Sequence, residues 1–140
     1  MLGREAADLG SLHFCHAAGR IGSALRIEVE QWLKDHPETK LIVLDTLASV
    51  RNPMQGRSNM YQSDTEDGHT LQQLAFKHQL ALFAIHHLRK RQQPRGVEDI
   101  LEEVSGTTGI TGTADTILVL RRSRGSSEGS LYVTSRDMPE

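Results

Sequence analysis

Three short apolar runs divide the sequence, and each is typical of a β-strand. They cover residues 41–44 (LIVL), 80–85 (LALFAI) and 116–120 (TILVL). Unbroken apolar runs rich in β-branched residues predict strands that are buried on both faces, as in parallel sheets covered by helices. A fourth run, 130–135 (SLYVTS), alternates more regularly and predicts an antiparallel edge strand. A further short strand is predicted for residues 11–15 (SLHFC).

Apolar residues recur at helical spacing between these runs. They predict a helix over residues 23–36, with Ser23 as its N-cap and Pro37 ending it. Further helices are predicted for residues 71–78 and 97–104. A helix that leads into a buried strand is half of a βαβ crossover, so the pattern favours an α/β fold with a mostly parallel sheet.

One polar segment predicts a loop, and a second segment is rich in Gly and Thr. Residues 51–67 contain a proline, a glycine and several Asn, Ser and Asp residues. Residues 105–115 (SGTTGITGTAD) carry glycines at positions 106, 109 and 112, where the backbone could approach a phosphate closely. At 140 residues the chain is expected to form a single domain over residues 1–140.

Composition limits the classes of protein that fit. The 16 Lys and Arg residues and 18 Asp and Glu residues give a net charge of −2, which excludes a general polycation but allows local basic clusters. The single cysteine, Cys15, cannot form an internal disulfide. The sequence has no apolar stretch of membrane-spanning length and no signal-peptide pattern. We therefore expect a cytoplasmic protein.

An acid follows the first strand. Asp45 comes directly after the apolar run, and hydroxyls follow at Thr46 and Ser49. Ligands of open parallel sheets lie beyond the carboxyl ends of the strands. An acid there is the form of a Walker B strand, which positions Mg²⁺ beside a nucleotide phosphate. The alternative is a buried strand that merely ends in an aspartate.

The strand predicted for residues 80–85 ends in a cluster of imidazoles and cations. His86 and His87 could donate a hydrogen bond to a phosphate oxygen. Four cations follow that could neutralise a nucleic-acid backbone: Arg89, Lys90, Arg91 and Arg95. The alternative is a solvated basic turn.

His13, Cys15 and His16 invite a metal-binding interpretation. Their spacing matches no standard zinc site, and the sequence offers no second ligand cluster. Residues at the end of a short strand are the favoured interpretation.

Four segments in series resemble the RecA-type ATPase domains of the RepA/DnaB-like hexameric replicative helicases. They are LIVLDTLASVR, AIHHLRK, VSGTTGITGTADTILVLRR and LYVTSRD. The order and spacing match, and the resemblance covers nearly the whole chain. It implies a partial RecA-like three-layer fold with a mostly parallel sheet and an antiparallel edge strand.

The resemblance also implies roles for individual residues. Asp45 would be the Walker B acid and metal-side ligand, with Thr46 beside it. His87 would occupy the sensor position next to His86, and residues 89–103 would form the loop that faces single-stranded DNA. Arg136 would be the arginine finger that reaches the nucleotide of a neighbouring subunit. Helicases of the DnaB branch usually have a lysine two residues before that finger, where this chain has Thr134.

The resemblance implies ATP and Mg²⁺ as ligands, single-stranded DNA as a partner, a hexameric assembly, and a role in DNA unwinding and replication. The phosphate-binding Gly-Lys-Ser/Thr motif is nevertheless absent from this sequence. We therefore expect no ATP hydrolysis by this chain alone. The alternative function is a non-catalytic module that binds nucleic acid or a protein partner through the same surface.

The family's central strand, which carries that motif, lies between the strands predicted here for residues 80–85 and 116–120. Without it, these two strands could pair directly, a second copy of the chain could supply a strand or cover the edges, or the sheet could remain only partly ordered. We expect direct pairing or a dimer.

Overall fold

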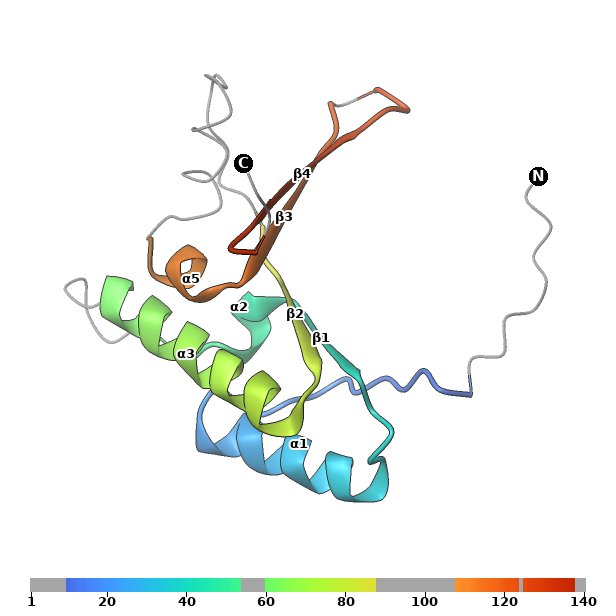
Figure 1. Cartoon of the computed structure of the whole chain (residues 1–140), viewed down its shortest axis with the longest axis vertical. Coiled ribbons are helices and arrows are strands. Elements are labelled where there is room, and N and C mark those ends of the chain that lie inside the picture. The colour runs from blue at the N-terminus through green and yellow to red at the C-terminus, as the bar shows by residue number, and fades with distance from the viewer. Residues whose placement is uncertain (1–9, 54–59, 88–107, 124, 138–140) are drawn as a thin grey trace.

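The computed structural model describes residues 10–53, 60–87, 108–123 and 125–137. Its elements in chain order are α1 (Ser23–Asp35), β1 (Leu41–Asp45), α2 (Leu47–Val50), α3 (Met60–His78), β2 (Ala81–Ile85), α5 (Thr108–Thr113), β3 (Thr116–Arg121) and β4 (Ser130–Ser135). The fold is mixed α/β, with one two-stranded parallel sheet and a separate two-stranded antiparallel sheet (Figure 1). None of the helices in these ranges is long and apolar enough to cross a membrane.

The parallel sheet pairs β1 with β2. The register runs from Leu41 opposite Ala81 to Asp45 opposite Ile85, so the two strands end at the same edge. The predicted strands and their parallel relation are confirmed, and the chain between them crosses over through α2 and α3.

The antiparallel sheet is a hairpin of β3 and β4 that projects from the α/β layers (Figure 1). The prediction of β4 as an antiparallel strand is confirmed. Direct pairing of β2 with β3, the first of the two expected arrangements, is wrong for the described residues, because β2 pairs with β1 and β3 with β4. Completion by a second copy stays a prediction. The base of the hairpin is instead attached to α3, where Gln72 Nε2 donates to Asp115 Oδ1 at 3.3 Å.

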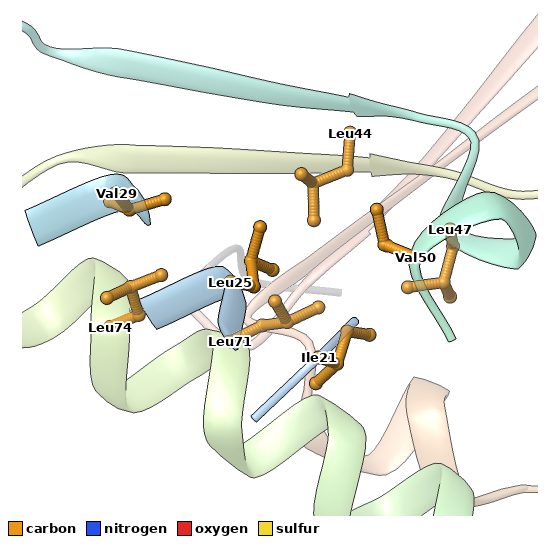
Figure 2. Packing of buried hydrophobic residues seen from close by; sticks show 8 residues of the cluster. All are labelled: Ile21, Leu25, Val29, Leu44, Leu47, Val50, Leu71 and Leu74. Atoms are coloured by element: carbon orange, nitrogen blue, oxygen red, sulfur yellow. The ribbon is translucent and has the colours of Figure 1, made fainter. Parts of the chain in front are cut away.

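The hydrophobic core lies between the parallel sheet and the helices α1 and α3 (Figure 2). Its buried members are Ile21, Leu25, Val29, Leu44, Leu47, Val50, Leu71 and Leu74. Ile42 and Leu82 pack against this cluster from the strands. Since side chains alternate along a strand, the helices cover only one face of the sheet.

The other face of the parallel sheet is open to solvent. Leu41, Val43, Phe83 and Ile85 are 49, 51, 48 and 41% exposed. The prediction that these strands are buried on both faces is therefore wrong in this structure, because α1 and α3 lie on the same side. Four large apolar side chains therefore face solvent on this side of the sheet.

Helix α1 confirms the helix predicted from residue 23, but its start differs in detail. Gly22 occupies the N-cap position with φ of 123°, and no side chain caps the helix. Ser23 is the first helical residue, so its prediction as the N-cap is wrong. A glycine tolerates this positive φ at no steric cost, which lets the chain turn into the helix directly after the buried Ile21.

The segment predicted to be a loop and the segment rich in Gly and Thr both contain helix. Helix α3 begins at Met60, inside the polar segment 51–67, and helix α5 spans Thr108–Thr113 within the glycine-rich segment. In both cases tertiary contacts override local propensity. The predicted strand at residues 11–15 is irregular, and the helix predicted for 97–104 lies outside the described residues.

Candidate functional site

The carboxyl edge of the parallel sheet, defined by Asp45, Thr46, His86 and His87, gathers four of the predicted site residues. Asp45 ends β1 opposite Ile85, so the residues that follow each strand emerge together. Asp45, His86 and His87 are exposed, and Thr46 is half-buried. An acid, a hydroxyl and two imidazoles therefore lie at one end of the sheet, where open α/β sheets bind ligands.

A short helix fixes the direction in which the chain leaves Asp45. Thr46 is the N-cap of α2, and its carbonyl accepts hydrogen bonds from Ser49 N at 2.9 Å and Ser49 Oγ at 2.6 Å. Leu47 is only 1% exposed and anchors α2 in the core. The Ser49 hydroxyl, which the sequence places near the candidate site, therefore donates to the backbone of the same turn.

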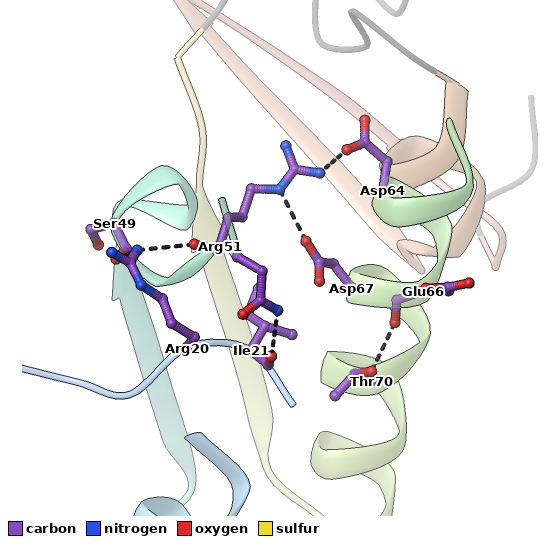
Figure 3. Close-up of polar contacts among 9 residues, drawn as sticks. Arg20, Ile21, Ser49, Arg51, Asp64, Glu66, Asp67 and Thr70 are labelled. Atoms are coloured by element: carbon purple, nitrogen blue, oxygen red, sulfur yellow. Dashed lines mark hydrogen bonds and ion pairs between the residues drawn. The ribbon is translucent and has the colours of Figure 1, made fainter. Parts of the chain in front are cut away.

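The segment before α1 holds the turn after Asp45 in place (Figure 3). Arg20 Nη1 donates to Ser49 O at 2.7 Å and to Arg51 O at 2.9 Å. The backbone N–H of Ile21 donates to Val50 O at 2.7 Å, and Asn52 Nδ2 donates back to Ile21 O at 2.9 Å. These contacts satisfy carbonyls at the end of α2 that have no partner within so short a helix.

Arg51 connects the same turn to helix α3. Its Nε donates to Asp67 Oδ2 at 3.2 Å, and its Nη2 pairs with Asp64 Oδ1 (Figure 3). Asp64 and Asp67 are each 7% exposed. Desolvation raises the pKa of Asp67 and outweighs the opposing hydrogen bond from Arg51. The folded state therefore gains stability from this group as the pH falls toward its raised pKa.

This buried ion cluster was not predicted. A signal was present in the sequence, since Asp64 and Asp67 are three residues apart and so share one face of a helix. The polar composition of the segment pointed instead to a loop, and the partner cation lies far enough away in the sequence that only the fold brings it close.

Arg136 directly follows β4, the second strand of the antiparallel sheet. Its Nη2 donates to Gly112 O at 2.7 Å, and its backbone N–H donates to Asp115 O at 3.0 Å. Its Nη1 is 3.5 Å from Asp115 Oδ1, the same oxygen that accepts a hydrogen bond from Gln72. In this structure Arg136 thus ties β4 to the carboxyl end of α5, and Thr134 pairs with Ile117 in the hairpin.

Arg136→Ala should lower the free energy of unfolding of this chain by about 1 kcal/mol, since the charge-assisted bonds are half exposed. Combining it with Asp115→Asn should cost less than the sum of the two single changes, because both remove the same contact. Urea unfolding followed by circular dichroism measures this. Arg122→Ala, on the exposed connection after β3, is the matched control. If both variants lost the same free energy of unfolding, the contacts of Arg136 would not stabilise the fold.

Metal binding by residues near the start of the chain is not supported. Within the described ranges, no group of three or more His, Cys, Asp or Glu side chains could hold a metal ion. His13 packs instead against Trp32 and His36, with ring centroids 4.9 Å away in each case. The strand-end interpretation is also wrong, since residues 11–15 are not in a strand.

Asp45 fits Mg²⁺ only as one ligand among several. Magnesium takes six oxygen ligands, keeps several waters and often uses just one or two carboxylates together with substrate phosphates. The exposed carboxylate of Asp45 and the neighbouring hydroxyl of Thr46 fit that role. They are too few to form a complete metal site by themselves. The predicted nucleic-acid contacts, Arg89, Lys90, Arg91 and Arg95 within segment 89–103, lie outside the described residues.

No protein-family model matches this chain, and no curated protein matches it. The geometry of the carboxyl edge and the series of sequence motifs are therefore what a functional proposal rests on.

Proposed function

We propose that this chain is the C-terminal part of a RecA-like ATPase core of the RepA/DnaB-like helicase kind, with its carboxyl edge facing ATP. Support comes from the parallel register of β1 and β2, which ends both strands at one edge, with Asp45 exposed at the end of β1 and His86 exposed directly after β2. An acid and imidazoles at adjacent strand ends are suited to a phosphate with its metal ion.

Each group at the edge has a distinct part in this proposal. Bound Mg²⁺ would neutralise charge on the phosphates. Asp45 would hold the metal's water ligands as a hydrogen-bond acceptor, with the Thr46 hydroxyl beside it. His86 and His87 carry N–H groups that can donate to a terminal phosphate oxygen. The phosphate cradle itself must come from another segment, because the sequence contains no Gly-Lys-Ser/Thr.

The open face of the parallel sheet also supports the proposal. Four large apolar side chains on β1 and β2 are about half exposed, and β2 has a partner only in β1 among the described residues. A sheet built in this way can accept another strand beside β2 and further structure over its open face. A Walker A segment would supply both: its strand could pair beside β2, and its helix could cover the open face.

Partners follow from the same proposal. Single-stranded DNA would contact the cations at 89–95, and a neighbouring copy in a hexamer would receive Arg136. Arg136 would first have to leave Gly112 and Asp115, which hold it within its own chain here.

ATP hydrolysis tests the proposal. This chain alone should show no Mg²⁺-dependent turnover above background, and Asp45→Ala should change nothing, because positioning of the phosphates is missing. In a longer form that carries a Walker A segment, Asp45→Ala should lower kcat at least about 100-fold, the scale seen when one charge-stabilising group is removed. Asp35→Ala, an exposed acid on α1, is the control. Turnover by this chain alone that depends on Asp45 would contradict the expectation.

The second candidate function is a non-catalytic module that binds single-stranded DNA or a protein partner. The absence of a Gly-Lys-Ser/Thr motif from the sequence favours it. The two functions differ in nucleotide dependence: DNA binding of equal affinity with and without ATP, in the longer form as well, would support the module and count against the ATPase.

A further inference from the structure

Three aromatic rings join the segment before α1 to the end of that helix. The ring of His36 stacks on Trp32 with centroids 3.7 Å apart and an angle of 16° between the planes. His13, from the preceding segment, lies 4.9 Å from both rings, with its plane tilted 63° from Trp32 and 50° from His36. We call these three residues the ring clasp.

Hydrogen bonds fix the orientation of the indole in the ring clasp. Trp32 Nε1 donates to Thr39 Oγ1 at 3.2 Å, and Thr39 Oγ1 in turn donates to His36 O at 2.8 Å. Two hydrogen bonds therefore connect the end of α1 to the turn that follows it. The segment carrying His13 is held further along, where the Gly19 N–H donates to Glu28 Oε2 at 2.7 Å.

One carboxylate is close to the two imidazoles. Glu38 Oε1 lies 3.4 Å from His36 Nδ1. The pKa of Glu38 is lowered first by its own backbone N–H and then by His36, with a smaller effect of His13, so Glu38 is charged wherever imidazoles titrate. The last turn of α1 adds Lys34 and Asp35, whose opposite charges cancel, and both are exposed. His16, near His13 in sequence, is exposed as well.

The number of protons on the ring clasp decides whether it is attractive. With both imidazoles neutral, stacking and edge-to-face contacts hold the rings together. One proton is tolerated, because a cation over an indole face is favourable and Glu38 can pair with His36. Two protons place like charges on rings 4.9 Å apart, and the carboxylate of Glu38, 3.4 Å from His36 Nδ1, can pair with only one of them.

We propose that the ring clasp is an acid-sensitive device that holds residues 10–16 against α1 near neutral pH and releases them when both imidazoles are protonated. Histidine is the side chain that proteins most often use to respond to mild acid, so a pair of imidazoles has the chemistry that such a device requires. The Gly19 bond to Glu28 would limit the movement to the residues that precede it.

A spin label on Cys15 tests the proposal in the full chain, because this is the only cysteine and it is exposed. Lowering the pH from about 8 to about 5 should remove the immobilised component of the electron paramagnetic resonance spectrum. His13→Gln and His36→Gln should each abolish this pH response, since either leaves at most one charge. His69→Gln, an exposed imidazole on α3, should respond as the unmodified chain does.

Two further measurements separate release from other effects of acid. Fluorescence of Trp32, the only tryptophan, should change over the same pH range as the label. Far-ultraviolet circular dichroism should stay constant, since the core is not involved. The proposal fails if the label stays immobilised at low pH, if the His13 and His36 variants keep the full response, or if the whole chain unfolds in acid to the same extent in all three variants.

Discussion

Arg51→Ala should lower the free energy of unfolding by about 3 kcal/mol, the range for breaking a buried ion pair. Arg51 is the cation that faces two buried carboxylates, Asp64 and Asp67. Without it, two like charges remain on one face of α3, away from water. The loss would also loosen the turn after Asp45, because the Arg51 carbonyl accepts a hydrogen bond from Arg20.

Urea unfolding of Arg51→Ala, Arg51→Lys and the exposed control Arg122→Ala measures the effect. Lysine keeps the charge but cannot bond both acids as a planar fork, so its loss should be intermediate. The loss in Arg51→Ala should shrink as the pH falls from neutral, because the pKa of Asp67 is already raised by burial and its protonation removes one of the two unpaired charges. A loss no larger than that of Arg122→Ala at neutral pH would show that the cluster does not stabilise the fold.

Gly68→Ala should also destabilise the chain, by about 1–3 kcal/mol, although alanine is the better helix former by about 1 kcal/mol. Gly68 lies inside α3, where that helix meets α5. A Cβ at this position would lie 2.0 Å from Thr113 Oγ1 and 2.9 Å from Thr113 Cβ. Both helices would have to separate, which would disturb the attachment of the β3–β4 hairpin.

Gly112→Ala is the matched control for this substitution. Gly112 is also helical, and nothing lies within 4 Å of a Cβ built there, so the change should stabilise the chain by up to about 1 kcal/mol. Thermal unfolding should therefore shift in opposite directions in the two variants. Thr113→Gly in the Gly68→Ala background should recover part of the loss, since it removes the atoms that clash. Stabilisation by Gly68→Ala alone would contradict the close packing of α3 on α5.

Local pattern was enough to predict where helix α1 and the four strands lie, but it did not predict how far the strands are buried. The helix that begins at Ser23 and the strands β1, β2 and β3 follow from apolar spacing, because each presents the residues that a core requires. The alternation in residues 130–135 was likewise enough to predict β4 as an antiparallel strand. The register that brings Asp45 and His86 to one edge follows once the strands are parallel, since such strands end together.

Contacts between distant segments decided the rest. The first part of α3 contains the acids Asp64 and Asp67, whose polar character predicted a loop. Arg51 pairs with both acids in the folded chain. Helix α5 can pack against α3 because Gly68 leaves space for Thr113. The position of Arg136 depends on its contacts with Gly112 and Asp115. The sequence by itself located the four segments that form β1 to β4 and the acid that ends the first of them, but it also predicted a strand at residues 11–15 that does not form. Only the tertiary structure decided that α1 and α3 share one face of the parallel sheet and that the hairpin stands apart, because burial and pairing depend on which segments meet in space.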